Sequence, residues 1–62
     1  MSKIVIVIAY TAYPDSQHVF LHTGVFEAET MEDVTATYDK MIEDARDGFP
    51  KLVVRNTRII QL

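Results

Sequence analysis

An unbroken run of five β-branched residues, Ile4 to Ile8, constrains the fold of this chain more than any other feature. β-branched side chains are stiff at χ1 and favour extended backbone, so the run predicts a strand from Lys3 to Thr11. Side chains of a strand point alternately to its two faces, and here both faces are apolar. A strand of this kind is normally covered on both sides. We therefore expect it at the centre of a sheet.

A second strand is predicted from His18 to Ala28, after a turn at residues 13–16 that contains Pro14. Proline presets the backbone of such a turn, and aspartate and serine side chains bond to it. The two strands should form an antiparallel hairpin. Gly24 lies in the middle of the second strand and indicates a bulge or a close approach of backbone.

Helix signals follow from Met31 to Asp47. Thr30 is a good N-cap residue, and Asp33 three positions later makes a weak form of the capping box. Apolar residues recur at helical spacing and form one stripe: Val34, Tyr38, Met41, Ile42 and Ala45. Gly48 is predicted to end the helix in the left-handed conformation.

The segment from Lys51 to Leu62 returns to strand composition. It forms either one long strand with a bulge, which we favour, or two short strands around Asn56. A hairpin followed by a crossover helix usually places the third strand beside the first. The predicted fold is one α+β domain over residues 1–62, a β-β-α-β chain with a three-stranded mixed sheet of order 2-1-3. One helix covers one face, and a short fourth strand at the C-terminus is the alternative.

One apolar face of the predicted sheet must be covered by something other than the helix, because one helix covers only one of its two faces. The chain has 62 residues and no cysteine, so it can form no disulfide, and the hydrophobic core of so short a chain is only marginally stable by itself. We expect a homodimer formed by sheet-face packing, by exchange of the C-terminal strand, or by both. The alternative is a monomer whose tail folds back over the open face. The predicted dimer-interface residues are Val5, Val7, Ala9, Phe20, Phe26, Ile59, Ile60 and Leu62.

Charge is strongly segregated, although the formal net charge is only -3. Eight of the nine acidic residues lie between Glu27 and Asp47, where the net charge is −6, and the segment from Lys51 onward carries +3. An acidic helix face either steers the chain toward a basic partner protein or serves only to keep a small protein in solution. The predicted partner-binding residues are Glu32, Asp39, Glu43, Asp44, Tyr13 and His18.

The sequence contains no catalytic or metal-binding motif. His18 and His22 fall on a predicted strand, where positions four apart are about 13 Å from each other and cannot chelate one ion. There is no nucleophile motif and no glycine-rich phosphate loop, and the chain has only two glycines. We therefore expect no metal, no cofactor and no enzymatic activity.

These features favour a non-enzymatic interaction protein that binds another protein and inhibits or modulates it. In size and organisation the chain resembles the small products that phages encode to disable host machinery or host defence. Two alternatives stay open, a small nucleic-acid-binding regulator and a small oligomeric enzyme with a pocket shared between subunits. The acidic balance disfavours nucleic acid. The first apolar run is too short to span a membrane, and the lack of cysteine favours the cytoplasm.

Overall fold

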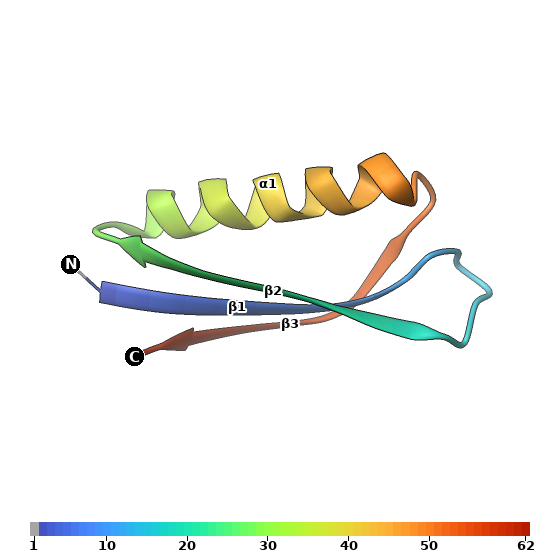
Figure 1. Cartoon of the computed structure of the whole chain (residues 1–62), viewed down its shortest axis with the longest axis horizontal. Coiled ribbons are helices and arrows are strands. Elements are labelled where there is room, and N and C mark those ends of the chain that lie inside the picture. The colour runs from blue at the N-terminus through green and yellow to red at the C-terminus, as the bar shows by residue number, and fades with distance from the viewer. Residues whose placement is uncertain (1) are drawn as a thin grey trace.

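Three strands and one helix make up the fold, which a computed structural model describes for residues 2–62 (Figure 1). The elements follow in the order β1 (Ser2–Thr11), β2 (Val19–Ala28), α1 (Met31–Gly48) and β3 (Val53–Gln61). The sheet order is β2-β1-β3, with the helix running along one side of the sheet (Figure 1). The predicted α+β class, element order, central strand and single helix are confirmed.

The sheet is antiparallel throughout and not mixed, which corrects the prediction. The hairpin reverses the chain between β1 and β2, and α1 carries it back along the sheet. β3 therefore runs in the direction of β2. Because it pairs with β1 and not with β2, every neighbouring pair is antiparallel. A parallel pair would have required a further reversal of the chain.

β3 is one strand with a bulge, as favoured, and the alternative fourth strand does not occur within residues 2–62. The register with β1 shifts between Ala9 and Tyr10, which leaves Arg55 as the extra residue of β3. The Arg55 guanidinium donates hydrogen bonds to Thr11 Oγ1 at 3.2 Å and to the carbonyl of Pro14 at 2.6 Å. The bulge thereby ties β3 to the hairpin loop, where Ser16 N–H bonds back to Tyr13 at 3.2 Å.

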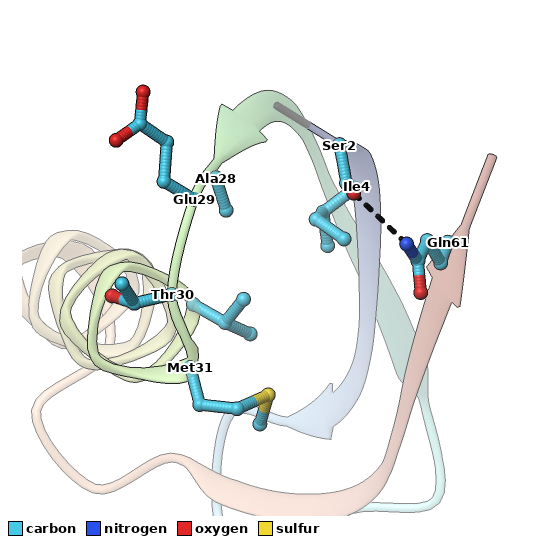
Figure 2. Close-up of a pocket in the computed structure, with 8 residues that line it drawn as sticks. Ser2, Ile4, Ala28, Glu29, Thr30, Met31 and Gln61 are labelled. Carbon is cyan, nitrogen blue, oxygen red and sulfur yellow. Dashed lines mark hydrogen bonds between the residues drawn. The ribbon is translucent and has the colours of Figure 1, made fainter.

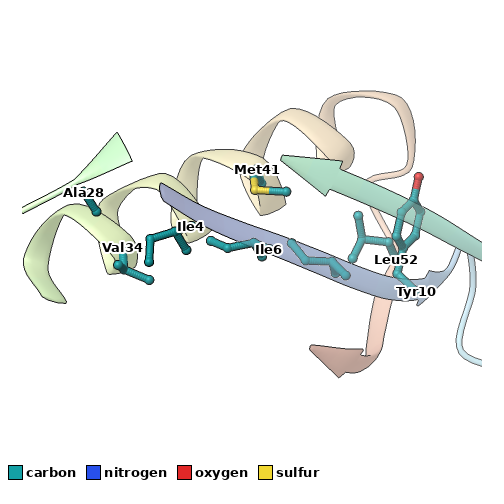
Figure 3. Close-up of a cluster of buried hydrophobic side chains, with 8 residues drawn as sticks. Ile4, Ile6, Tyr10, Ala28, Val34, Met41 and Leu52 are labelled. Atoms are coloured by element: carbon teal, nitrogen blue, oxygen red, sulfur yellow. The ribbon is translucent and has the colours of Figure 1, made fainter. Parts of the chain in front are cut away.

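The hydrophobic core lies between α1 and the face of β1 that carries Ile4, Ile6, Ile8 and Tyr10 (Figure 3). Ile6 is completely buried at its centre. The helix, β2 and the segment before β3 complete the core with Val34, Met41, Ala28 and Leu52. The strand alternation of β1 thus decides which side chains are covered, and its other side chains, at positions 5, 7 and 9, face away from the helix.

Both ends of α1 have an identifiable cause. Asp33 N–H donates to Thr30 Oγ1 at 3.3 Å, and Thr30 N–H donates to Asp33 Oδ2 at 3.2 Å, so the capping box is complete. At the other end the predicted left-handed stop at Gly48 is wrong, because no glycine among residues 2–62 has a positive φ. Gly48 is the last helical residue, and Phe49 leaves the helix with φ −133°. The Phe49 ring stacks on Phe20 at a centroid distance of 5.3 Å, which holds the chain in that direction.

Gly24 lets the helix approach β2 closely. Of the two roles predicted for Gly24, a bulge does not occur, because the ten residue pairs of β1 and β2 are in regular register. The other role, a close approach, does apply, but the group that approaches is a side chain and not backbone. A Cβ atom at position 24 would lie 2.9 Å from Met41 Sδ and 3.0 Å from Met41 Cε. The glycine therefore leaves room for the Met41 side chain, which is buried between α1 and the sheet.

Replacing Gly24 with isoleucine is expected to destabilise the protein by about 1–3 kcal/mol, because the new side chain displaces Met41 from a filled core. Gly24→Ala should cost much less, since only the flexible end of Met41 has to move. Urea unfolding followed by circular dichroism measures both. Combining Gly24→Ile with Met41→Ala should cost less than the sum of the two single substitutions, and strictly additive losses would mean that the two positions do not compete for space.

We expect the capping carboxylate of Asp33 to make the stability of the helix depend on pH. Its carboxylate accepts hydrogen bonds from the N–H groups of Glu29 and Thr30, which lower the pKa of Asp33 below its ordinary value of 3.8. The folded state thus favours the charged carboxylate, so this contribution is present above the ordinary pKa and is lost as the pH falls through the lowered pKa. We expect Asp33→Asn to reduce the fall in unfolding free energy between neutral and acidic pH. Asp39→Asn, which removes an exposed carboxylate of α1 outside the capping box, is the matched control.

Candidate protein-interaction surface

The face of the sheet opposite α1 is uncovered and carries a continuous apolar area. Its side chains come from alternate positions of β1 and β2, which the register places side by side: Val5 beside Val25, and Ala9 beside Leu21. We call this area the open-face stripe, and its residues are Val5, Val7, Ala9, Val19, Leu21 and Val25. Leu21 is 70% exposed, Val25 60% and Val19 52%. The largest side chains of the stripe are thus those on the edge strand.

β3 borders the stripe with a more polar side. Arg58 lies beside Val7 and Asn56 beside Ala9 on the open face, whereas Ile60 lies beside Val5. The arrangement therefore has an apolar centre over β1 and β2 and a polar margin over the middle of β3. An apolar core with a polar rim is the usual anatomy of a protein–protein interface.

The predicted dimer-interface residues do not lie on one face. Their positions divide into an open-face group of Val5, Val7, Ala9 and Ile60 and a helix-face group of Phe20, Phe26 and Ile59. Leu62 follows β3, and its N–H donates to the carbonyl of Lys3 at 2.9 Å. Phe20 and Phe26 pack against the core on the side of the helix, and Phe20 also stacks on Tyr10 at 5.6 Å.

The residues of β2 that line the open face are not the two predicted phenylalanines but Val19, Leu21 and Val25. The alternation of the strand separates these two sets in the sequence, but both sets are apolar. Gly24 is the signal that could have distinguished them, because a glycine beside the phenylalanines marks the face that the helix approaches.

The predicted partner-binding residues are also spread over the molecule. Glu32, Asp39, Glu43 and Asp44 are all exposed on α1. Glu32 lies in the first turn of α1. Tyr13 and His18 lie in the hairpin loop, next to the part of β2 where Phe20 stacks on Phe49 at the other end of the helix. The His18 ring packs edge-on against Phe20 at 4.6 Å. The acidic residues and the loop therefore do not make one compact site.

The helix packs closer to β2 than to β3, and two open cavities lie beside it. One, of about 150 Å³, lies between α1 and β3 and is lined by Met31, Val34, Thr35, Tyr38, Thr57 and Ile59. The Tyr38 and Thr57 hydroxyls are hydrogen-bonded across it at 3.1 Å. The other, of about 180 Å³, lies at the start of the helix beside the Ser2–Gln61 hydrogen bond of 2.9 Å (Figure 2). Both are small for a ligand site, which usually measures about 300 Å³ or more.

The described residues, 2–62, contain no cluster of three histidine, cysteine, aspartate or glutamate side chains that could hold a metal ion. The same residues form no helix that is long and apolar enough to cross a membrane. Among these residues, the open-face stripe gathers three of the exposed large apolar side chains, Val19, Leu21 and Val25. Comparison with known proteins adds nothing to it, because no family model, curated protein or solved structure matches this chain.

Proposed function

We propose that this chain is a non-enzymatic interaction protein that acts as a homodimer and binds another protein, which it inhibits or modulates. One observation carries the proposal: Leu21, Val25 and Val19 stay more than half exposed in a contiguous apolar stripe. Water disfavours such a surface, and soluble monomers rarely leave large apolar patches bare unless a partner covers them.

A second surface favours basic partners. The exposed acidic residues of α1 lie on the side of the molecule away from the open-face stripe. Their summed charge accelerates encounter with a positively charged protein but adds little to the strength of a formed contact. In this proposal the stripe supplies affinity, and the acidic helix supplies orientation and rate.

The target class follows from the size and organisation of the chain. A small protein that exposes an apolar stripe is suited to occupy a surface of a larger protein. We propose that it works in the cytoplasm in the manner of the small proteins that phages use against host machinery or host defence. Its target would then be a component of a bacterial cell.

Affinity capture from a bacterial lysate tests this function. We expect the tagged wild-type chain to retain one or a few proteins, identified by mass spectrometry, and Leu21→Lys to lose them. Met31→Lys is the matched control, because Met31 is an equally exposed apolar residue, at 72%, that lies on the helix. The double reversal Asp39→Lys/Glu43→Lys should slow capture and reduce its dependence on salt.

Capture that is unchanged by Leu21→Lys would contradict the role of the open-face stripe. Recovery of nucleic acid, with an affinity that falls steeply as salt rises, would instead favour a nucleic-acid-binding regulator. A rise in melting temperature with one compound of a metabolite panel would favour an enzyme with a shared pocket.

A further inference from the structure

We propose that two copies of this chain pair along β2, antiparallel to each other, to form one continuous six-stranded sheet with a two-fold axis at Thr23. The inference deepens the proposed function, on whose homodimer it rests, by assigning the dimer contact to the β2 edge. It also assigns the open face of the joined sheet to the target protein.

The two edges of the sheet differ in the features that prevent pairing with another chain. β3 carries a bulge at Arg55 and a second charged side chain at Arg58. Bulges and charges of this kind protect edge strands against further pairing. β2 has no bulge, because its register with β1 is regular over ten residues. Its one charged residue, Glu27, lies next to its end, so Asp, Glu, Lys and Arg are absent from Val19 to Phe26. The β2 edge is therefore the one that is open to a further strand.

The sequence of β2 is complementary to itself. With the two-fold axis at Thr23, Leu21 lies opposite the partner subunit's Val25, and Phe20 lies opposite the partner subunit's Phe26. Cross-strand apolar and aromatic pairs of this kind stabilise antiparallel sheets. Moving the axis to His22 would place Leu21 opposite a threonine and Phe20 opposite a glycine, and would shorten the paired segment. The register at Thr23 is thus the one that matches apolar residues best.

The position of α1 is compatible with this pairing. Met41 packs over Gly24, which places the helix near β2, and a two-fold axis perpendicular to the sheet keeps both helices on one side. Strands are about 4.8 Å apart, so helices lying between β1 and β2 of each copy would be separated by about 10 Å. That value is near the upper end of the usual 8–10 Å for packed helices. The two helices therefore fit side by side without moving.

The helix flank that faces the partner carries both signs of charge. Tyr38 bonds to Thr57 and so marks the flank toward β3. Helical geometry places Thr37, Lys40 and Asp44 on the opposite flank, toward β2. Lys40 of one copy can then approach the partner subunit's Asp44, which offsets the repulsion between two acidic helices.

Face-to-face stacking of two open faces is the competing arrangement. A stack that covers all three strands would bring Arg58, which lies beside Val7 on the open face, under the partner sheet. Removing a charge from water without a paired carboxylate is costly. Edge pairing leaves Arg58 at the outer margin and joins the two open-face stripes into one area four strands wide. The side-on contact covers about 500 Å² per copy, or about 1,000 Å² in total, which is the lower limit for a specific interface.

Intermolecular disulfide formation tests the register, since the chain contains no cysteine. Residues opposite each other in an antiparallel pair have Cα atoms about 4.5–5.5 Å apart, within the range that a disulfide spans. We expect Thr23→Cys to convert most of the protein to a covalent dimer under mild oxidation. Arg58→Cys, an exposed position on the same face but on the other edge strand, β3, should remain largely uncrosslinked.

Spin labels at position 58 then distinguish the two dimers. The two copies of β3 lie five strand spacings apart in the six-stranded sheet, about 24 Å between backbones, whereas stacked three-stranded faces keep them within about 14 Å. A short distance, or a Thr23→Cys protein that stays uncrosslinked while light scattering shows a dimer, would overturn the inference. So would a monomer at high micromolar concentration.

The outcomes also separate this inference from the proposed function. If the chain is monomeric but still captures a target, and that capture requires Leu21, the binding function stands and the β2 dimer is excluded. A Thr23→Cys dimer with the expected spin-label distance, but with no protein retained from lysate, would support the dimer and count against the function.

Discussion

Replacing Ile6 with alanine is expected to remove roughly half of the free energy of unfolding. Ile6 is fully buried at the centre of β1, beneath the helix. Truncating a buried isoleucine costs about 2–5 kcal/mol, because apolar burial is lost and a cavity is left. A domain of this length has only about 3–9 kcal/mol in total. Urea unfolding followed by far-ultraviolet circular dichroism should show a partly unfolded protein already at low urea.

Val7→Ala is the matched control for this prediction. Val7 is the next residue of the same strand, with the same β-branched shape, but it faces the open side and is only half-buried. We expect a loss of about 1 kcal/mol or less in the monomer. Equal losses at the two positions would mean that something also covers the open face in solution, as it would in a dimer formed by stacking. Repeating the comparison at two protein concentrations separates these cases.

The elements and the strand order could be predicted from local patterns. The β-branched run, the turn at Pro14 and the cap at Thr30 each act over a few residues, and the crossover rule then leaves few topologies. The end of the helix was predicted at nearly the right residue for the wrong reason. Gly48 does not turn the chain; Phe49 does, because its ring packs against Tyr10 and Phe20, which are distant in sequence.

Hydrophobicity could not identify the uncovered face, because both faces of β1 and β2 are apolar, and Gly24 was the one residue that marked the face under the helix. Hydrophobicity alone ranks Phe20 and Phe26 above Leu21 and Val25 for any contact surface. The structure reverses that choice, since Phe20 joins an aromatic cluster with Tyr10 and Phe49 on the helix side. That cluster depends on long-range contacts among three separate segments. The bulge at Arg55 is similar, since its hydrogen bonds reach back to Thr11 and Pro14.

The double substitution Leu21→Lys/Val25→Lys is expected to raise the dissociation constant of the dimer about 100-fold or more while the fold is retained. Removing one apolar side chain from the interface costs about 1.5 kcal/mol of binding free energy, and every 1.4 kcal/mol is a factor of about ten. Both side chains are mostly exposed in the single chain, and lysine is well tolerated on edge strands. Sedimentation over a concentration series measures the association, and thermal unfolding checks the fold.

Two further variants show whether the loss of apolar burial is the cause of the weaker association. Met31→Lys/Thr35→Lys adds the same two charges at exposed positions of α1, and it should leave the dissociation constant unchanged within a factor of a few. The uncharged pair Leu21→Gln/Val25→Thr should weaken association nearly as much as the lysines, and high salt should not restore it, because screening removes repulsion but does not restore apolar burial. If salt restores the lysine variant and the uncharged pair still associates, the edge tolerates polar side chains. Backbone pairing along β2 would then hold the dimer, and the open-face stripe would serve the target protein alone.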